Sequence, residues 1–147
     1  MMLAQAENAD LEAVVDLFAR SRQVCLPFLP VLHSREEDLD FFGGYIQRGQ
    51  MTLARVDGAV AGFLAQTPGW IEHLYLDPAL RRRGIGQALM AHAKMEADQL
   101  DLWCFAENHA ARAFYAAQGF AEIGGTQGDN EAGLPDILLR WQAGAAL

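Results

Sequence analysis

The sequence predicts one α/β domain of the α+β type, and three observations carry this prediction. Apolar residues recur at helical spacing in some segments and alternate in others. Glycine and proline pairs separate these segments into a strand, two helices, three strands, a helix, a strand, a helix and a final pair of strands. The chain has 147 residues, 52% of them hydrophobic, without a low-complexity tract or a linker. We therefore expect residues 1–147 to form a single domain.

The first part of the chain is expected to hold one strand and two helices. Residues 2–6 form a short apolar start, and Asp10 can cap a helix that carries Leu11, Val14, Val15 and Phe18. Two prolines in the apolar run 26–32 exclude a regular helix and predict a loop. Ser34 and Glu37 are spaced as a capping box for a second helix, with apolar residues Leu39, Phe42 and Ile46.

The middle of the chain contains the strongest hairpin signal. Residues 51–56 and 59–66 are strand-like and flank Asp57-Gly58, where the glycine can adopt a positive φ. Pro68-Gly69 predicts another turn. The following run, residues 70–76, is predicted to be a strand that stops at Asp77-Pro78, because proline lacks the donor that a central strand needs.

The last part predicts a helix, a strand, a helix and two strands. The third helix should bury Leu89, Ala93 and either Ala97 or Leu100. Residues 102–105 are predicted to be a strand, and Asn108 can cap a fourth helix that ends at Gly119 and turns Ala110, Ala111 and Phe114 inward. Residues 120–123 and 136–141 should pair antiparallel across the polar loop 124–133.

Composition and charge exclude several classes of function. A net charge of −8 argues against binding nucleic acid through a general basic field. The sequence contains neither a long apolar run nor a signal-peptide pattern, so we expect a cytoplasmic protein that does not insert into membranes. Cys25 and Cys104 are isolated, and the histidines do not cluster with other ligands, so neither a disulfide framework nor a metal site is expected.

The segment from Arg81 to Gly86, with the sequence Arg-Arg-Arg-Gly-Ile-Gly, predicts an anion site at the start of the third helix. Backbone N–H groups there have no intrahelical partner and face a positive dipole end. A dinucleotide fingerprint would need a small residue at position 89, which is Leu, and an acidic residue closing the next strand, whereas Asp101 precedes it. A nucleoside-triphosphatase loop would need Gly-Lys-Ser/Thr. From the loop alone, a solvated basic turn stays an alternative.

Four linked motifs resemble the GNAT superfamily of N-acetyltransferases, in its small bacterial type. The acyl-CoA signature Arg/Gln-x-x-Gly-x-Gly/Ala corresponds to Arg81, Gly84 and Gly86. It follows a strand that ends Leu76-Asp77-Pro78 and precedes Asn108, Phe114-Tyr115 and Gly119-Phe120 in the family's order and spacing. The resemblance implies the GNAT fold, with a mixed, mostly antiparallel sheet of about six to seven strands flanked by about four helices. It also implies acetyl-CoA as cosubstrate, no metal, and a primary amine of a small molecule or peptide as acceptor.

The resemblance also assigns roles to individual residues. The acyl-pantetheine arm would enter between residues 70–76 and the strand 102–105. Tyr115 would be the general acid, and its unperturbed pKa near 10 keeps it protonated at neutral pH. The residues implied in cofactor binding are Leu74, Tyr75, Leu76, Arg81, Arg82, Arg83, Gly84, Ile85, Gly86, Gln87, Asn108 and Tyr115. Asn108 could equally act only as a helix cap, and Tyr115 could be a core aromatic residue.

The base and the acceptor site are less specified by the sequence. Glu72 is our candidate for general base, expected at a half-buried strand position where desolvation would raise its pKa. His73 is the rival, on the opposite face unless a β-bulge intervenes. The acceptor pocket should involve the loop 26–32, the second helix and the region of Trp70. The alternative function is a non-catalytic acyl-CoA-binding or sensing module. Homodimers are common in the family, although no exposed stripe in this sequence requires one.

Overall fold

A seven-stranded mixed sheet with four α-helices forms the described part of the computed structural model, residues 1–80 and 82–144. The strands lie in the order β1-β2-β3-β4-β5-β7-β6, and every neighbouring pair is antiparallel except β4 and β5. This confirms the predicted fold class. The strands are β1 (Met2–Gln5), β2 (Met51–Val56), β3 (Ala59–Thr67), β4 (Trp70–Leu76), β5 (Gln99–Phe105), β6 (Ala121–Thr126) and β7 (Asp136–Gln142). Arg81, expected in the anion-binding turn, lies outside the described residues.

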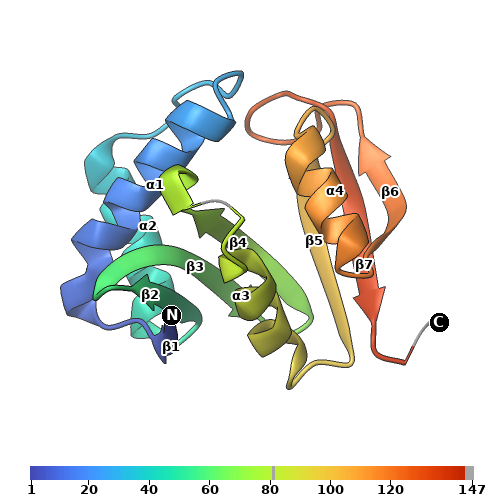
Figure 1. The fold of residues 1–147 in the computed structure, drawn as a ribbon. Coiled ribbons are helices and arrows are strands. Elements are labelled where there is room, and N and C mark those ends of the chain that lie inside the picture. The colour runs from blue at the N-terminus through green and yellow to red at the C-terminus, as the bar shows by residue number, and fades with distance from the viewer. Residues whose placement is uncertain (81, 145–147) are drawn as a thin grey trace.

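The helices cover both faces of the sheet (Figure 1). One apolar cluster packs α1 (Leu11–Cys25) and α2 (Arg35–Gln47) against β2 and β3, centred on Phe42 and Phe63. The other cluster packs α3 (Ile85–Lys94) on the opposite face and continues into β5 and β7. Phe114 and Tyr115 of α4 (His109–Ala117) pack against this second cluster. The sheet therefore separates two apolar cores, one on each of its faces.

Several local signals hold as predicted. Ser34 and Glu37 form both hydrogen bonds of the capping box at the start of α2. The β2–β3 hairpin turns at Asp57 and Gly58, both with positive φ (53° and 81°). Asn108 caps α4 by accepting from the N–H of Ala111 at 3.2 Å. Each of these features is satisfied within a few residues of chain, which explains why the sequence reveals it.

Asp10 occupies the N-cap position of α1, but the expected cap hydrogen bond is wrong. Its carboxylate instead accepts from the N–H of Glu7 at 2.8 Å and pairs with Arg55 at 2.5 Å. These partners keep the carboxyl ionised to lower pH: although burial acts in the other direction, they lower the pKa of Asp10. Asp10 thus ties the start of α1 to β2 rather than closing the helix end.

The third and fourth helices depart from the prediction in extent. Helix α3 ends at Lys94, so Ala97 follows it and Leu100 belongs to β5, which begins earlier than expected, at Gln99. Leu89 and Ala93 are buried as predicted. In α4, Ala111 and Phe114 pack against the core, whereas Ala110 is exposed. Strand β6 starts and ends later than expected, at Ala121 and Thr126, so the loop before β7 is shorter.

Strands β4 and β5 meet at one end and then separate. Their register contains the single pair Trp70 and Asp101, next to a hydrogen bond of 2.9 Å from the N–H of Asp101 to the carbonyl of Gly69. Arg140 of β7 donates to both carboxylate oxygens of Asp101, at 2.8 and 2.9 Å. Beyond this point the strands diverge into a V that opens toward Leu76 and Phe105, as Figure 1 shows. The parallel pair therefore supplies a gap in the middle of the sheet.

None of the described helices combines the length and the apolar character that crossing a bilayer requires.

Candidate active site

Two cavities share the wall that β4 and the end of β5 make. A cavity of about 160 Å³ lies in the V, lined by β4, β5, the end of α1 and the residues Asn108, Ala111 and Tyr115. A larger one, of about 500 Å³, lies toward α1 and α2. His73, Tyr75 and Phe105 line both. We call the first the donor cavity and the second the acceptor cavity, after the roles that we propose for them below.

A β-bulge in β4 shapes this wall. Ala65 pairs with His73 and Gln66 pairs with Ile71, so Glu72 is an extra residue that has no opposite residue in the register with β3. The bulge interrupts the simple alternation that would put Glu72 and His73 on opposite faces, and both residues line the donor cavity.

Glu72 is exposed, which corrects the expected half-buried position. Its Oε1 accepts a hydrogen bond of 2.7 Å from the Thr67 hydroxyl. The carboxylate therefore lies at the solvent side of the donor cavity, which it helps to line.

His73 lies in an aromatic box. The rings of Phe41, Phe42 and Tyr45 have their centroids 5.2 to 5.4 Å from the imidazole, and Tyr75 stacks on it at 6.2 Å. Burial in this box lowers the pKa of His73 to about 4. The imidazole is therefore neutral at pH 7, because burial disfavours its charged form.

Tyr115 reaches the donor cavity from α4. Its ring packs on Phe114 and Phe120, with centroid distances of 5.3 and 5.7 Å. Burial raises the pKa of Tyr115, and the acidic groups of Cys104 and Tyr75 act in the same direction. Burial also raises the pKa of Tyr75 to about 12 and that of Cys104 to about 11. All three groups consequently carry their protons at neutral pH, so each is a potential donor.

The turn before α3 presents backbone donors to an anion. Gly84, the N-cap, has a φ of 75°, and Arg82 has a φ of 64°. The N–H of Ala88 bonds to the carbonyl of Gly84 at 3.0 Å, so the N–H groups of residues 85–87 precede the helical ladder. No side chain caps this end. Free N–H groups at the positive end of a helix dipole, next to Arg82 and Arg83, fit a pyrophosphate.

A family model provides the comparison that decides the assignment. The model of the Acetyltransferase (GNAT) family matches residues 11–120, three quarters of the chain. The chain belongs to the GNAT family of acetyltransferases. It is accordingly an N-acetyltransferase whose cosubstrate is acetyl-CoA, as the motifs implied.

Individual relatives agree with this assignment over nearly the full length. Peptidyl-lysine N-acetyltransferase YiaC of Escherichia coli is 28% identical over 95% of this chain and 96% of its own. The solution structure of apo YjaB from Escherichia coli matches with a TM-score of 0.77 and 24% identity, over 99% and 100% of the two chains. A Thermoplasma acidophilum PaiA N-acetyltransferase, solved with coenzyme A, matches with a TM-score of 0.75 and 18% identity, over 96% and 98%.

In this GNAT acetyltransferase, the predicted cofactor residues follow the path from the turn to the V. Leu74, Tyr75 and Asn108 line the donor cavity, while residues 82–87 form the turn and the first part of α3. Asn108 uses its side-chain oxygen as the helix cap, which leaves its NH₂ group available as a donor. Both roles considered for this residue are therefore compatible. Among the described residues, no group of three or more His, Cys, Asp or Glu could hold a metal ion.

The acceptor cavity of this enzyme is only partly the one expected. The predicted loop 26–32 and α2 contribute Leu29, Pro30, Leu32, Phe41 and Phe42. Trp70, which we also expected, is not among its lining residues. The loop between β6 and β7 closes it instead, through residues 130–132. The only sequence signal for this role was the polarity of that loop, which we interpreted as a simple connection.

Proposed function

We propose that this GNAT acetyltransferase moves the acetyl group of acetyl-CoA directly to a primary amine of a peptide or small molecule, and specifically to a lysine side chain of a peptide. The shared wall of His73, Tyr75 and Phe105 is the observation that carries the proposal. These residues lie between the two cavities, so a donor in the V and an amine in the acceptor cavity would be held close to each other, and direct transfer needs no intermediate carrier on the protein. We take residues 1–147 to act as one domain, which should unfold in one cooperative transition.

The cofactor assignment follows the chain from the turn to the V. The backbone around Leu74, Tyr75 and Leu76 offers hydrogen-bonding groups to the pantetheine arm, because on its β5 side β4 has no paired strand there. Backbone groups of residues 82–87, with Arg82 and Arg83, hold the pyrophosphate. Asn108 donates from its NH₂ group to the arm. When bound, acetyl-CoA supplies the activated acetyl group, and the protein supplies position and protons.

Tyr115 acts as general acid in this proposal. Its hydroxyl gives a proton to the departing sulfur of CoA as the new amide bond forms. The raised pKa of Tyr115 keeps this proton in place before the reaction. Cys104 lines the same cavity, but a thiol whose pKa is raised to about 11 is a poor nucleophile at neutral pH, which supports direct transfer.

Glu72 acts as the base that collects the proton lost by the amine, directly or through water. Two observations favour it over His73. The bulge places Glu72 at the donor cavity with an exposed carboxylate, from which a proton passes easily to solvent. Burial in the aromatic box disfavours the charged imidazolium that His73 would become on taking up a proton, whereas a carboxylate becomes neutral.

The lining of the acceptor cavity supports a cationic acceptor with an apolar stem. Its floor is aromatic, formed by Phe18, Phe41, Phe42, Tyr75 and Phe105. Three carboxylates line it: Glu37, Asp38 and Glu131. Asp38 is half-buried, and burial raises its pKa, so a nearby cation would stabilise its ionised form. A lysine side chain combines an aliphatic stem with such a cation, and the similarity to YiaC, named a peptidyl-lysine N-acetyltransferase, agrees with this choice.

The test is an assay of acetyl transfer to a panel of amines. We expect lysine-containing peptides to be acetylated on the side chain, identified by mass spectrometry, in preference to peptide N-termini and to small apolar amines. A protein that binds acetyl-CoA in calorimetric titration and acetylates none of the panel would instead support the alternative, a sensing module without chemistry. Acetylation confined to peptide N-termini would contradict the lysine assignment alone.

A further inference from the structure

His33 joins the two sides of the acceptor cavity. Its Nδ1 lies 3.3 Å from Oε2 of Glu37, in the first turn of α2. Its Nε2 pairs with Oε1 of Glu131, in the loop between β6 and β7. His33, Glu37 and Glu131 all line the acceptor cavity. One imidazole is thus held between two carboxylates that come from opposite sides of the cavity.

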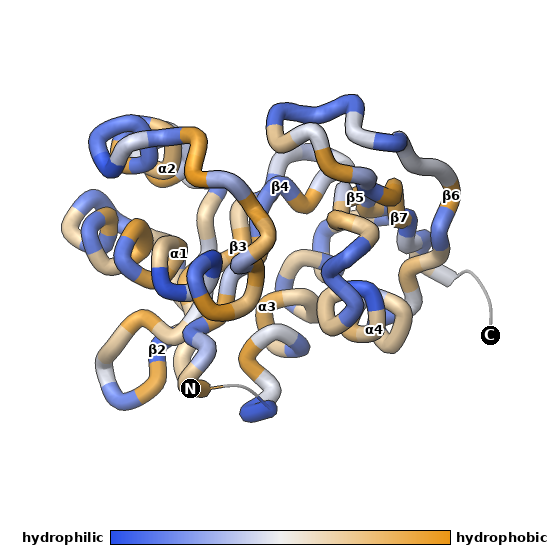
Figure 2. The backbone as a smooth tube through the Cα atoms, turned by 90° about the horizontal axis from the view of Figure 1, so that it is seen from above, coloured by the Kyte–Doolittle hydropathy of each residue, from blue (hydrophilic) through white to orange (hydrophobic). Residues whose placement is uncertain are grey.

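The segment that carries His33, residues 26–33, leaves α1, reaches toward β5 in the other half of the split sheet and returns to α2; we call it the strap. The ring of Phe28 meets that of Phe105 on β5 at 6.4 Å. Arg22 of α1 donates to the carbonyl of Pro30 at 2.7 Å. Figure 1 shows the strap and the β6–β7 loop facing each other across the open end of the V, and Figure 2 shows the first mainly hydrophobic and the second hydrophilic.

We propose that His33 is an internal competitor for the acceptor: its imidazolium occupies Glu37 and Glu131, and a cationic peptide must displace it to enter the acceptor cavity. The strap is then an autoinhibitory contact that selects acceptors with a cation close to the reacting lysine. This inference rests on the proposed lysine acceptor, because an uncharged acceptor would gain nothing from the two carboxylates.

The other charges around His33 do not replace it in this role. Arg22 is engaged with the Pro30 carbonyl, and Arg35 of α2 pairs with Asp16 of α1 at 2.8 Å. Asp38 faces the same region and adds negative charge. Hydrogen bonding to Glu37 and the charge of Glu131 raise the pKa of His33. The N–H of Ser34, followed by the hydrogen bond to His33, lowers the pKa of Glu37. The imidazole is consequently the cation held directly between Glu37 and Glu131.

The direction of the pH dependence follows from this arrangement. His33 binds its proton more tightly in the closed strap than in a free chain, so the closed state is favoured below its raised pKa and weakens as pH rises through that value. Deprotonation of the acceptor amine also increases the rate as pH rises. The contribution of the strap is therefore defined as the difference between the protein and a His33 variant at each pH.

The first experiment needs no turnover. The ring protons of His33, assigned by comparison with His33→Asn, are followed by NMR from pH 5 to pH 9 with and without tetralysine, in the absence of acetyl-CoA. We expect tetralysine to return the pKa of His33 toward 6.5, because it takes over the two carboxylates. A titration curve that tetralysine leaves unchanged overturns the proposal. This result is independent of whether lysine is the acetylated group.

The second experiment uses steady-state kinetics with a lysine peptide that carries a neighbouring arginine. His33→Asn is expected to lower the KM for this peptide about two- to fivefold near pH 6, the effect of losing one exposed ion pair, with kcat and the KM for acetyl-CoA unchanged. The ratio of the peptide KM of the parent to that of His33→Asn should approach one by pH 9. Glu131→Gln should raise the peptide KM, and Glu36→Gln, an exposed carboxylate on α2, should not.

A purely structural strap predicts the opposite pattern. If His33→Asn raises the peptide KM or lowers kcat, or if the ratio is constant with pH, the contact only supports the fold and the proposal is wrong. If none of the variants acetylates any lysine peptide, the proposed function fails, and the NMR titration still decides whether His33 competes with a cation.

Discussion

Gly86 lies directly against the ring of Phe114. A Cβ atom added to Gly86 would be 3.1 Å from Cζ of Phe114 and 3.2 Å from Cδ1 of Leu76, closer than side chains normally pack. The second glycine of the signature therefore lets α3 dock closely on β4 and α4. Since Tyr115 follows Phe114, the anion-binding turn and the proposed acid belong to one packed unit. Gly84 differs, because its position is open and only its φ of 75° requires glycine.

Replacing Gly86 with a larger residue should destabilise the protein. Gly86→Val forces methyl groups against Phe114 and Leu76, and overpacking of this kind lowers the free energy of unfolding by about 1–3 kcal/mol. Urea denaturation at pH 7 measures it. Equal free energies of unfolding of the variant and the parent would show that α4 can move away at little cost and that the packing between α3 and α4 is weak.

Gly84→Ala serves as the matched variant in the same turn. Its Cβ meets no atom within 4 Å, so only the left-handed backbone is strained, at a cost of roughly 1–2 kcal/mol. If the turn relaxes to relieve this strain, its N–H groups move and the Kd for acetyl-CoA rises. Calorimetric titration with acetyl-CoA should show this loss, and an unchanged Kd would remove the turn from cofactor binding.

Removing the hydroxyl of Tyr115 should affect catalysis and leave binding intact. We expect Tyr115→Phe to lower kcat by about 10²–10⁴-fold, the usual range for a general acid, with little change in the KM for acetyl-CoA. Tyr45→Phe, on α2 and outside both cavities, is the control. Because the pKa of Tyr115 is raised, this group should cause no loss of kcat up to about pH 10, its unperturbed value. Parental turnover by Tyr115→Phe would exclude the assignment.

His73 should make the fold sensitive to acid. The pKa of His73 is about 4 in the folded protein and 6.5 in the unfolded chain. The unfolded state therefore binds more protons between these two pH values. The contribution of His73 to the free energy of unfolding is then largest above pH 6.5 and is lost as pH falls toward 4. The two pKa values correspond to a loss of about 2 kcal/mol between pH 7 and pH 5.

A variant pair isolates this contribution. His73→Phe should flatten the dependence of the free energy of unfolding on pH between 7 and 5, measured by urea denaturation. His92→Gln, at an exposed position of α3, should keep the slope of the parent. His33 is present in both variants and so cancels from the comparison. An identical slope in His73→Phe would mean that the imidazole is not buried as described.

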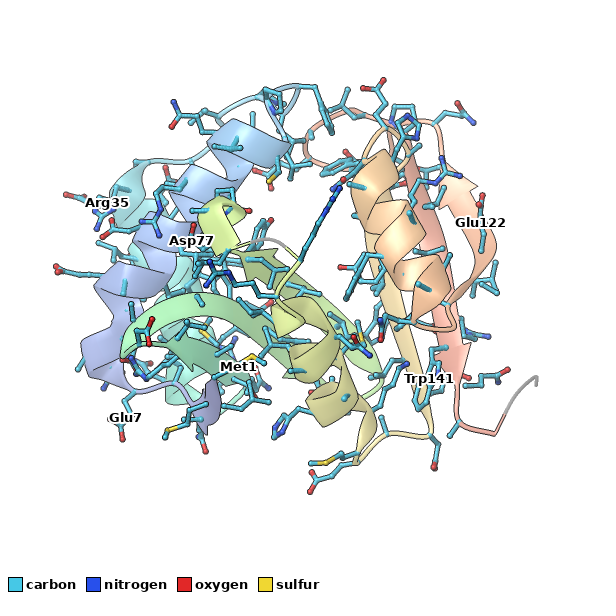
Figure 3. All side chains as sticks on the ribbon, viewed as in Figure 1. Met1, Glu7, Arg35, Asp77, Glu122 and Trp141 are labelled. Carbon is cyan, nitrogen blue, oxygen red and sulfur yellow. The ribbon has the colours of Figure 1, made fainter. Side chains whose placement is uncertain are left out.

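Asp38 should contribute to the recognition of a cationic acceptor. Asp38→Asn is expected to raise the KM for a lysine peptide about fivefold, as for one partly exposed ion pair, without changing kcat or the KM for acetyl-CoA. Asp40→Asn, exposed on the same helix, is the control for the helix N-terminal charge. Figure 3 shows Glu122 on the outer side of β6, away from the V, where Glu122→Gln should also have no effect. Equal effects of all three would indicate a response to net charge alone.

Local signals in the sequence were sufficient for most elements, and specific residues show where they failed. The Ser34–Glu37 box and the Asp57-Gly58 turn are complete within four residues and were predicted correctly. Asp10 was assigned to a cap because that is the local option, but Arg55, 45 residues away, draws its carboxylate to β2. Leu100 fits the stripe of a helix, yet pairing with Trp141 makes it a strand residue.

The sequence by itself determined the family and the order of the elements and predicted an anion-binding turn before α3, because capping, turn formation and helix-end anion binding act over a few neighbouring residues. Only the tertiary structure decided the bulge at Glu72, the V that opens beyond Trp70 and Asp101, and the closure of the acceptor cavity by residues 130–132. These features depend on how segments far apart in the chain pair and pack. Their free energy comes from contacts that no short stretch of sequence contains.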